Sequence, residues 1–227
     1  MDILILTYSE SISWKELESF LGCLTPARQR GVLKKKSCFD RINTLLSRLL
    51  VLSEISRRTG IPEKKIRFDF GAHGKPYLKN SSLQFSLSHT KGAVCAAFSA
   101  IEASSDSAAD SGKPENNEIG EIGIDVEDRS RRVADTMYKR SLSPEEQASV
   151  HTPEDFLRVW VKKEAFLKRM GTGIISDLRG LNTNILPDTA AFDCGDYIIG
   201  ASGKGALTAA INMITLDELL NRYIKLN

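Results

Sequence analysis

The chain has 227 residues, enough for one large domain or for two small lobes that each have a core. Hydrophobic residues make up 41% and charged residues 26%, the ordinary balance of a soluble globular protein. The formal net charge is only +2, so no overall positive field points to a nucleic acid as partner. No apolar run approaches the roughly 18 residues that span a membrane, which excludes a membrane protein.

The cysteines and the N-terminus indicate a cellular compartment. The four cysteines include no CxxC pair, which argues against a zinc module and against a disulfide scaffold. The apolar N-terminus has no basic region before it, so we interpret it as a strand and not as a signal peptide. We therefore expect a cytoplasmic protein.

The first half of the chain predicts a strand, helices and then a group of strands. Residues 1–10 are predicted to form a strand, and a helix should begin at Trp14. Leucines spaced by three and four predict the strongest helix over Asp40–Arg58, with Gly60 ending it. Alternating residues predict a strand in 66–70 and two more within 85–99.

A polar segment divides the chain nearly in half. Residues 102–118 contain no aromatic residue and no Val or Leu, and only their flanks are apolar. Such a composition cannot bury enough apolar surface to offset the entropy of ordering. We expect an N-terminal lobe over 1–103, a flexible linker or insertion over 104–117 and a C-terminal lobe over 118–227.

The second half begins with a predicted strand, EIGIDVE. Ser143 is placed as an N-cap, followed by Pro144 and by Glu146 at the third helical position. A longer helix is predicted from Pro153 to Arg169, where Gly171 stops it. Two or three strands and a last helix, LDELLNRYI, should complete the lobe.

Two segments of the chain resemble each other. KGAVCAAF at 91–98 and KGALTAAI at 204–211 share five of eight residues. One interpretation is a chance match between strands of small residues. The other is a pair of similar α+β lobes, with a cleft between them that would be a natural ligand site.

Two acids stand in the apolar run GIDVE. On a strand, Asp125 and Glu127 lie on one face, and the residues between them lie on the other. Like charges this close are unfavourable unless a positive group compensates them or solvent surrounds them. A solvated strand face is therefore one interpretation, and a cation site is another.

The segment WVKKEAFLKRMGTGI adds a third acid. On a helix, Trp160, Glu164 and Lys168 share one face, which is compatible with an ordinary Glu–Lys pair. If the helix packs beside GIDVE, however, Glu164 completes a set of three carboxylates. An all-oxygen site of this kind suits Mg²⁺, which commonly shares its coordination sphere with substrate phosphates.

Two motifs in the first lobe, GKPYL at 74–78 and FSLSHT at 85–90, could bind an anion. Pro76 replaces the Ser or Thr of a phosphate-binding loop, and the glycine spacing is wrong, so that class is excluded. His89 fits either a capped turn or an anion site shared with Ser88 and Lys91.

Together, GKPYL, FSLSHT, GIDVE and WVKKEAFLK resemble the motifs of the Sfp-type 4′-phosphopantetheinyl transferases in order and spacing. The resemblance implies an α+β fold of two similar lobes in pseudo-twofold arrangement, each a small, mostly antiparallel sheet packed with helices. It also implies an enzyme that transfers the phosphopantetheine arm of coenzyme A to a serine of an apo acyl or peptidyl carrier protein. The other product would be 3′,5′-ADP.

The resemblance also assigns roles to individual residues. It implies that Mg²⁺ is held by Asp125, Glu127 and Glu164, with Trp160 supporting the site. Glu164 is our candidate for the base and Lys168 for a catalytic cation. The residues expected to contact coenzyme A are Lys75, Ser88, His89, Lys163 and Lys168.

Two positions depart from the family pattern. Asn43 and Gly31 stand where relatives often carry basic residues. Arg28, Arg41 and Lys34–Lys36 are therefore the candidates for binding the 3′-phosphate of coenzyme A. A basic segment, DRSRRVADTMYKR, follows GIDVE, and we expect Arg131 and Arg132 to contact the carrier protein.

Two other functions are compatible with parts of the sequence. A different Mg²⁺-dependent phosphoryl-transfer enzyme, such as a nuclease, would use the same three acids but would leave GKPYL and FSLSHT unexplained. A basic RNA- or membrane-binding module would use Lys34–Lys36, although no aromatic residues are interleaved there to stack on bases. We expect a monomer that binds neither nucleic acid nor membrane.

Overall fold

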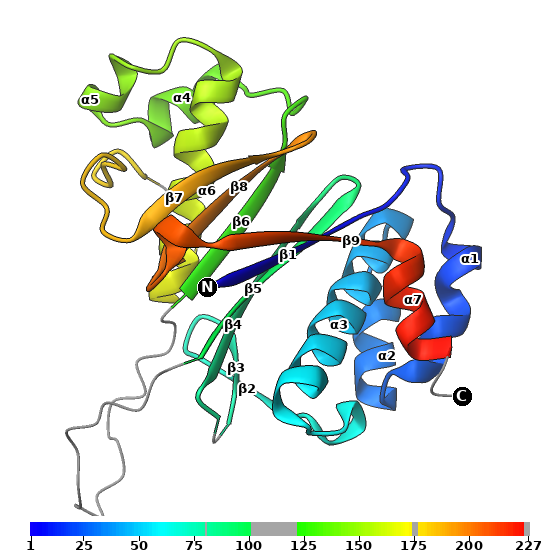
Figure 1. Ribbon diagram of the computed structural model, residues 1–227. Helices are drawn as coiled ribbons and strands as arrows, with labels where there is room; N and C mark the ends of the chain where they lie inside the picture. Colours follow the sequence, from blue (N-terminus) through cyan, green and yellow to red (C-terminus); the bar gives the residue numbers. More distant parts are fainter. Residues whose placement is uncertain (80, 101–121, 174–176, 225–227) are drawn as a thin grey trace, which may run out of the picture.

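The computed structural model describes residues 1–79, 81–100, 122–173 and 177–224, and the predicted linker at 104–117 lies outside them. The fold is α+β, with two main sheets that each carry a long helix, as expected (Figure 1). Within the described residues, no helix is both long enough and apolar enough to cross a membrane.

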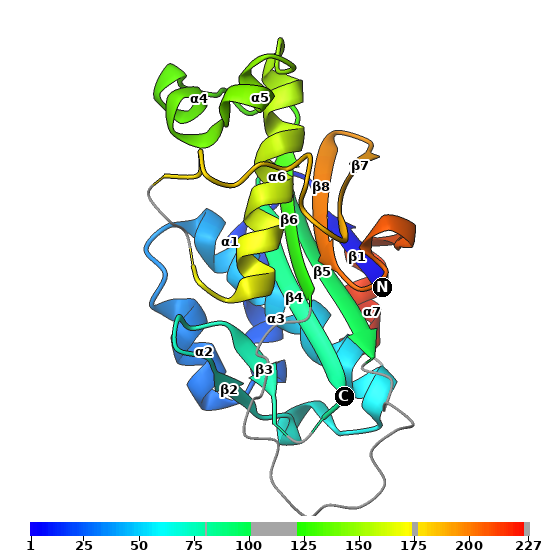
Figure 2. The ribbon, with the colours of Figure 1, turned by 90° about the vertical axis from the view of Figure 1, so that its left-hand side faces the viewer.

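The first sheet has four strands in the order β4-β5-β1-β9. β1 pairs antiparallel with β5 and parallel with β9, so the last strand of the chain extends the sheet that the first strand begins. Helices cover one face of this sheet, and a short hairpin of β2 and β3 lies at its β4 side (Figures 1 and 2). The strands are β1 (Asp2–Thr7), β2 (Phe68–Phe70), β3 (Pro76–Leu78), β4 (Leu83–Thr90), β5 (Ala93–Ala100) and β9 (Ala210–Thr215).

The longest helix of the first lobe is α3 (Cys38–Thr59), close to the predicted range. The Ser37 hydroxyl accepts the backbone N–H of Asp40 at its start, and Gly60 adopts φ 71° at its end. Its leucine stripe is buried against the sheet, where it dominates the larger core. The other helices of this layer are α1 (Trp14–Leu17), α2 (Pro26–Leu33) and α7 (Leu216–Ile224).

The second sheet is antiparallel, in the order β6-β8-β7. Capping boxes start two of its helices: Ser143 pairs with Glu146, as predicted, and Thr152 pairs with Asp155. The strands are β6 (Ile122–Asp128), β7 (Thr189–Cys194) and β8 (Tyr197–Gly203), and the helices are α4 (Asp135–Ser141), α5 (Pro144–Gln147) and α6 (Pro153–Met170).

The sequence match between 91–98 and 204–211 does not correspond to equivalent elements. The first segment forms a turn and most of β5. The second forms a turn, the 3-10 helix Ala206–Thr208 and the beginning of β9. The chain then stays with the first lobe, because β9 pairs with β1 and the Tyr223 hydroxyl of α7 donates to the Leu49 carbonyl of α3 at 2.7 Å.

The two lobes share a hydrophobic core. The face of the first sheet that is turned away from α3 packs against β6 and β8, and the inward side chains include Ile5, Cys95, Ile124 and Ile199. The continuous core between the sheets fixes how β4 and β6 lie relative to each other.

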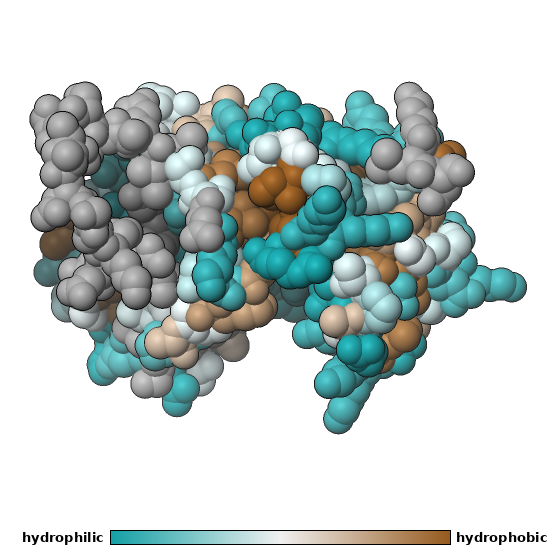
Figure 3. All heavy atoms as spheres, turned by 90° about the horizontal axis from the view of Figure 1, so that it is seen from below, coloured by the Kyte–Doolittle hydropathy of each residue, from teal (hydrophilic) through white to brown (hydrophobic). Residues whose placement is uncertain are grey.

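Seen from below, the molecule exposes apolar side chains in the middle of one face, with hydrophilic side chains around them (Figure 3).

Two glycines bring α6 unusually close to the second sheet. A Cβ atom at Gly123 of β6 would overlap the Ala165 carbonyl of α6, and a Cβ at Gly200 of β8 would overlap the Val161 carbonyl. Glycine in a strand is typical of places where another backbone approaches closely. Asp125, two residues further along β6, lies on the same face as Gly123 and is therefore directed toward α6.

We predict that Gly123→Ala destabilises the protein by about 1–3 kcal/mol, because the added methyl group forces α6 away from β6. Denaturant unfolding of the variant measures the loss. Gly22→Ala is the matched control, since a Cβ there meets no atom within 4 Å. Equal stability of the two variants would contradict the close-packing argument.

Candidate active site

The candidate site begins with Asp125 of β6. The residue is 5% exposed, and its Oδ1 accepts hydrogen bonds from Ser88 Oγ at 2.8 Å and from Lys168 Nζ at 2.7 Å. Lys168 also donates to Ser88 Oγ at 2.8 Å. Three of the residues singled out in the sequence thus meet at one point, and they come from β4, β6 and α6.

Glu127 lies two residues further along β6 and on the same face. The indole N–H of Trp160 donates to its Oε1 at 3.0 Å, and Arg131 forms an ion pair with the same oxygen. The Arg131 guanidinium also lies 5.5 Å from the centre of the Trp160 ring. Arg131, which we expected to contact a carrier protein, is thus paired with Glu127 in this structure.

The acids of this site are electrostatically coupled. Burial, and then the charge of Asp125, raise the pKa of Glu127 to about 7. The same two causes, in the same order, raise the pKa of Glu164 to about 7. Asp125 and Glu164 therefore face each other closely enough for one carboxylate to disfavour ionisation of the other.

The predicted three-acid metal site is not formed in this arrangement. Among the described residues, no three His, Cys, Asp or Glu side chains converge as a metal would require. Asp125 and Glu127 are paired with Lys168 and Arg131 instead, which relieves the repulsion between carboxylates.

The donor set nevertheless fits a hard cation. Asp125 Oδ2 and Glu164 Oε1 are buried and have no hydrogen-bond partner. Buried carboxylate oxygens without a partner are costly, and carboxylate oxygens are the ligands that Mg²⁺ prefers. These two atoms would satisfy part of a magnesium coordination sphere.

A pocket of about 270 Å³ lies beside these acids, and both lobes line it. Lys75 reaches across the lobes, since its Nζ donates to the carbonyls of Ile122 at 2.8 Å and Arg169 at 3.3 Å. Burial, and then the charge of Arg169, lower the pKa of Lys75 to about 8. The remaining lining includes His73, Gly74, Pro76, residues 85–87 and Lys168.

His89 lies at the end of β4, near the start of α3. Desolvation, followed by the charge of Lys168, lowers its pKa, and Lys35 adds to the effect. Arg41 follows Lys35 by six residues, and its Nε donates to the Lys35 carbonyl at 2.8 Å. Neutral His89 therefore stands in a basic environment where a bound anion would favour its protonation.

Arg28 lies on the other side of Pro76. Its guanidinium donates to the Ile66 carbonyl at 2.8 Å and lies 5.3 Å from the centre of the Phe68 ring. It lines a second, larger pocket that shares Pro76, Phe85 and Leu87 with the first.

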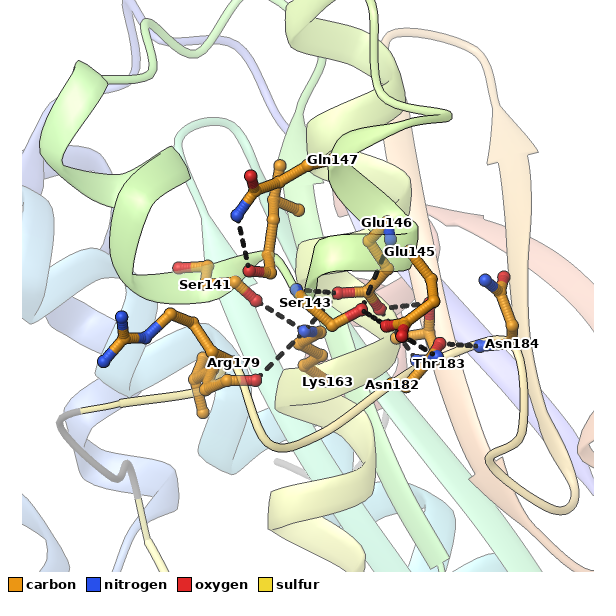
Figure 4. A network of polar contacts seen from close by, with 12 residues as sticks. Ser141, Ser143, Glu145, Glu146, Gln147, Lys163, Arg179, Asn182, Thr183 and Asn184 are labelled. Atoms are coloured by element: carbon orange, nitrogen blue, oxygen red, sulfur yellow. Dashed lines mark hydrogen bonds and ion pairs between the residues drawn. The ribbon is translucent and has the colours of Figure 1, made fainter.

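Lys163, which we expected to contact coenzyme A, lies elsewhere in the second lobe. Its side chain is fully buried, and its Nζ donates to the carbonyls of Ser141 and Leu178 and pairs with Glu146 (Figure 4). Burial raises the pKa of Glu146, but its hydrogen bonds from Lys163 and Thr183 outweigh that effect and lower it overall. Because all of these partners lie within the second lobe, Lys163 is not available to a phosphate in this structure.

Sequence reasoning missed three residues of this region. Arg131 was assigned to a partner surface, Arg169 was not considered, and Glu146 was used only as a capping residue. Glu146 Oε2 accepts the Ser143 N–H at 2.8 Å, as a capping residue should. Glu146 Oε1 also accepts the Thr183 N–H at 2.7 Å. The spacing of four between Glu127 and Arg131 is the one signal that could have revealed a contact.

Two family models match different halves of the chain. The model for the 4′-phosphopantetheinyl transferase superfamily matches residues 121–193, and the N-terminal model for 4′-phosphopantetheinyl transferases matches residues 11–101. The chain belongs to the 4′-phosphopantetheinyl transferase superfamily.

Several characterised proteins are similar to the chain. The L-aminoadipate-semialdehyde dehydrogenase-phosphopantetheinyl transferase of Saccharomyces cerevisiae is 31% identical over 71% of this chain, and the match spans 58% of that protein. The 4′-phosphopantetheinyl transferase Sfp of Bacillus subtilis is 26% identical over 92% of this chain and 95% of its own length. The 4′-phosphopantetheinyl transferase HetI of a Nostoc species is 31% identical over 51% of this chain and 46% of its own length.

We predict that Lys163→Met lowers the free energy of unfolding by about 3–5 kcal/mol, because it leaves Glu146 charged and buried without its counter-ion. Adding Glu146→Gln should recover part of the loss, since no buried charge then remains. Lys162→Met is the control, because the neighbouring Lys162 is only partly buried and is in no ion pair within the described structure. Equal losses in the two single variants, measured by denaturant unfolding, would refute the role of the pair.

We also predict a pH effect at Glu164 in the presence of EDTA. Its folded-state pKa of about 7 lies above the ordinary value of 4.5, so the folded state binds the proton more tightly. The stability it contributes is present below pH 4.5 and is lost as the pH rises through 7. The glutamine of Glu164→Gln does not titrate, so the variant avoids this loss. When the pH is raised from 5 to 8, the stability of the variant relative to the wild type should increase by about 1–3 kcal/mol.

Unfolding of both proteins at the two pH values measures this difference. Glu18→Gln, which removes an exposed carboxylate, should leave the pH dependence of the wild type unchanged. A Glu164→Gln variant that follows the wild-type pH dependence would contradict the coupling of Glu164 to Asp125.

Proposed function

We propose that this protein transfers the 4′-phosphopantetheine arm of coenzyme A to a serine of an apo acyl or peptidyl carrier protein and releases 3′,5′-ADP. The observation that carries this proposal is the meeting of Asp125, Glu164 and Lys168 beside a pocket that both lobes line. Acids for a cation and lysines for phosphate oxygens, side by side, suit a pyrophosphate substrate.

Mg²⁺ would be held by Asp125, Glu127 and Glu164, and when bound it would neutralise charge on the pyrophosphate. The two partnerless oxygens, Asp125 Oδ2 and Glu164 Oε1, support this assignment. Arg131 and Trp160 both hold Oε1 of Glu127, which fixes the orientation of that carboxylate from outside the site.

Coenzyme A would occupy the pocket between the lobes. Lys75 and Lys168 line it and would face phosphate oxygens, and Ser88 holds Lys168 in place through its hydroxyl. His89 would add a further donor at the end of β4. Lys163 has no direct part in binding in this scheme, because it is buried in the network of Figure 4.

The transfer needs one bond to form and one to break. The serine Oγ attacks the β-phosphorus, a new P–O bond forms, and the P–O bond to 3′,5′-ADP breaks. Glu164 accepts the serine proton, since it lies on α6 beside Asp125 and Lys168, where the pyrophosphate would be held. Lys168 stabilises the charge that develops on the leaving phosphate, so positioning and electrostatics carry most of the catalysis.

The protein would act as a monomer in the cytoplasm. One chain supplies both lobes of the pocket, so no second copy is required to complete it. None of the described cysteines is in a disulfide, and Cys95 is buried, in keeping with a reducing compartment.

The decisive experiment incubates the protein with coenzyme A, Mg²⁺ and a panel of apo carrier proteins, and measures carrier mass. We expect the mass of a phosphopantetheine arm to be added, and EDTA to prevent it. Asp125→Ala and Glu164→Ala should each lower the rate by at least about 100-fold, while Glu18→Ala, an exposed control, should not.

Two outcomes would contradict the proposal. Full activity of Asp125→Ala and Glu164→Ala would remove the acids from the mechanism. Mg²⁺-dependent cleavage of other phosphodiesters, with no transfer from coenzyme A to any carrier, would favour a nuclease-like enzyme that uses the same acids.

A further inference from the structure

The turn between β2 and β3 brings Lys75 into contact with the other lobe. Two hydrogen bonds of 2.9 Å close this turn, from the Gly71 N–H to the Lys75 carbonyl and from the Gly74 N–H to the Gly71 carbonyl, and Gly74 adopts φ 81°. Lys75 Nζ then donates to the Ile122 carbonyl of β6 at 2.8 Å and to the Arg169 carbonyl of α6 at 3.3 Å. Backbone atoms of the second lobe therefore hold this amine in a defined place.

Lys75 has no carboxylate partner. Within the parts of the chain that the structure describes, it is in no ion pair, and none of the residues found along the pocket of about 270 Å³ is an Asp or Glu. The charged or titratable groups around it are Lys168 and Arg169 of α6 and His73 of its own turn, and β4 contributes the uncharged residues 85–87. The Arg169 guanidinium has a buried Nη1 without a hydrogen-bond partner. A positive charge on Lys75 is thus opposed by its neighbours and compensated by no anion.

The hydrogen bonds of Lys75 are those that suit a neutral amine. A neutral amine has two N–H donors and a lone pair, and the carbonyls of Ile122 and Arg169 accept both donors. An ammonium group has three donors, and among the described residues the third finds no acceptor. Burial, and then the charge of Arg169, lower the pKa of Lys75 to about 8. At pH 8, about half of the molecules therefore present a free lone pair beside the pocket.

We propose that Lys75 Nζ is a nucleophile that becomes acylated by small acyl phosphates, such as acetyl phosphate. The lone pair attacks the acyl carbon and an N–C amide bond forms. The C–O bond to the phosphate breaks, and inorganic phosphate leaves with the electron pair and takes up the surplus proton of the amine. A desolvated lysine next to a second cation is the environment that activates an amine for such attack. The charges of Lys168 and Arg169 favour a donor whose leaving group is an anion.

Acylation of Lys75 would change the contact between the lobes. The amide nitrogen keeps a single N–H, so it can serve only one of the two carbonyls, of Ile122 or of Arg169, that Nζ now serves. The positive charge of Lys75 is lost as well, and with it one of the two lysines that line the pocket. Acyl phosphates would therefore inhibit transfer from coenzyme A. This consequence, unlike the acylation itself, rests on the proposed function.

The test incubates the full chain with acetyl phosphate and measures acetylation of each lysine by mass spectrometry of its peptides. Lys79 is the internal reference, because it directly follows β3 of the same hairpin and its side chain is 69% exposed. At pH 8, Lys75 should be acetylated at least about tenfold faster than Lys79, since an ordinary exposed lysine is almost entirely protonated at this pH. The rate at Lys75 should level off above about pH 9, where the amine is already neutral.

Variants and a second reagent separate the causes. Arg169→Gln removes the neighbouring charge and should slow acetylation of Lys75 by about threefold or more, whereas Arg169→Lys should keep it fast. Arg132→Gln, which removes an exposed arginine, is the matched control and should have no effect. The uncharged thioester S-acetyl-N-acetylcysteamine should give a lower ratio of Lys75 to Lys79 acetylation than acetyl phosphate gives, and added pyrophosphate should lower the ratio for acetyl phosphate. Thermal unfolding of each variant verifies that the fold is intact.

Each result decides the proposal. Acetylation of Lys75 no faster than that of Lys79 would overturn it, as would an equal or higher ratio with the uncharged thioester. Treatment with acetyl phosphate should lower the transfer rate of the wild type and should not lower further whatever activity Lys75→Arg retains. If Lys75 is acetylated rapidly but the protein modifies no carrier, the inference stands and the proposed function fails. If carriers are modified and Lys75 reacts no faster than Lys79, the proposed function stands and the inference fails.

Discussion

The close approach of α6 to β6 is the constraint on which the site depends. Where other strands carry a side chain, Gly123 presents none, so the helix backbone packs directly on the strand. Only at this separation can Glu164 influence the ionisation of Asp125 and Lys168 pair with it. The glycine in GIDVE is therefore as much a part of the site as the two acids that follow it.

A second feature of the structure is that carboxylates and arginines are gathered in separate clusters. The protein as a whole has a formal net charge of +2, but it gathers carboxylates at one place between the lobes and arginines in the pocket beside it. Each cluster is unfavourable by itself, because like charges raise the free energy of the folded state. Ligands of opposite charge would relieve both clusters, so the folded state is organised for binding at some cost to its own stability.

Local patterns predicted much of this fold, and long-range packing explains what they missed. The leucine stripe, the glycine stops and the capping box of Ser143 placed α3, α5 and α6 closely, because each depends on neighbouring residues alone. The return of β9 to pair with β1 depends on partners about 200 residues apart, which no local pattern encodes. The match between 91–98 and 204–211 was misleading for the same reason, since similar residues were placed in a strand and in a 3-10 turn by different surroundings.

The adjacent residues Lys163 and Glu164 show why the site was only partly predictable. Trp160, Glu164 and Lys168 recur at a spacing of four and share a helix face, whereas Lys163 is rotated by about 100° from Glu164. That rotation turns Lys163 toward Ser141, Glu146 and Leu178, where three oxygens accept hydrogen bonds from its Nζ. A lysine next to a candidate site acid is readily taken for a phosphate-binding residue, yet here Lys163 ties α6 to Ser141, Glu146 and Leu178 within the second lobe.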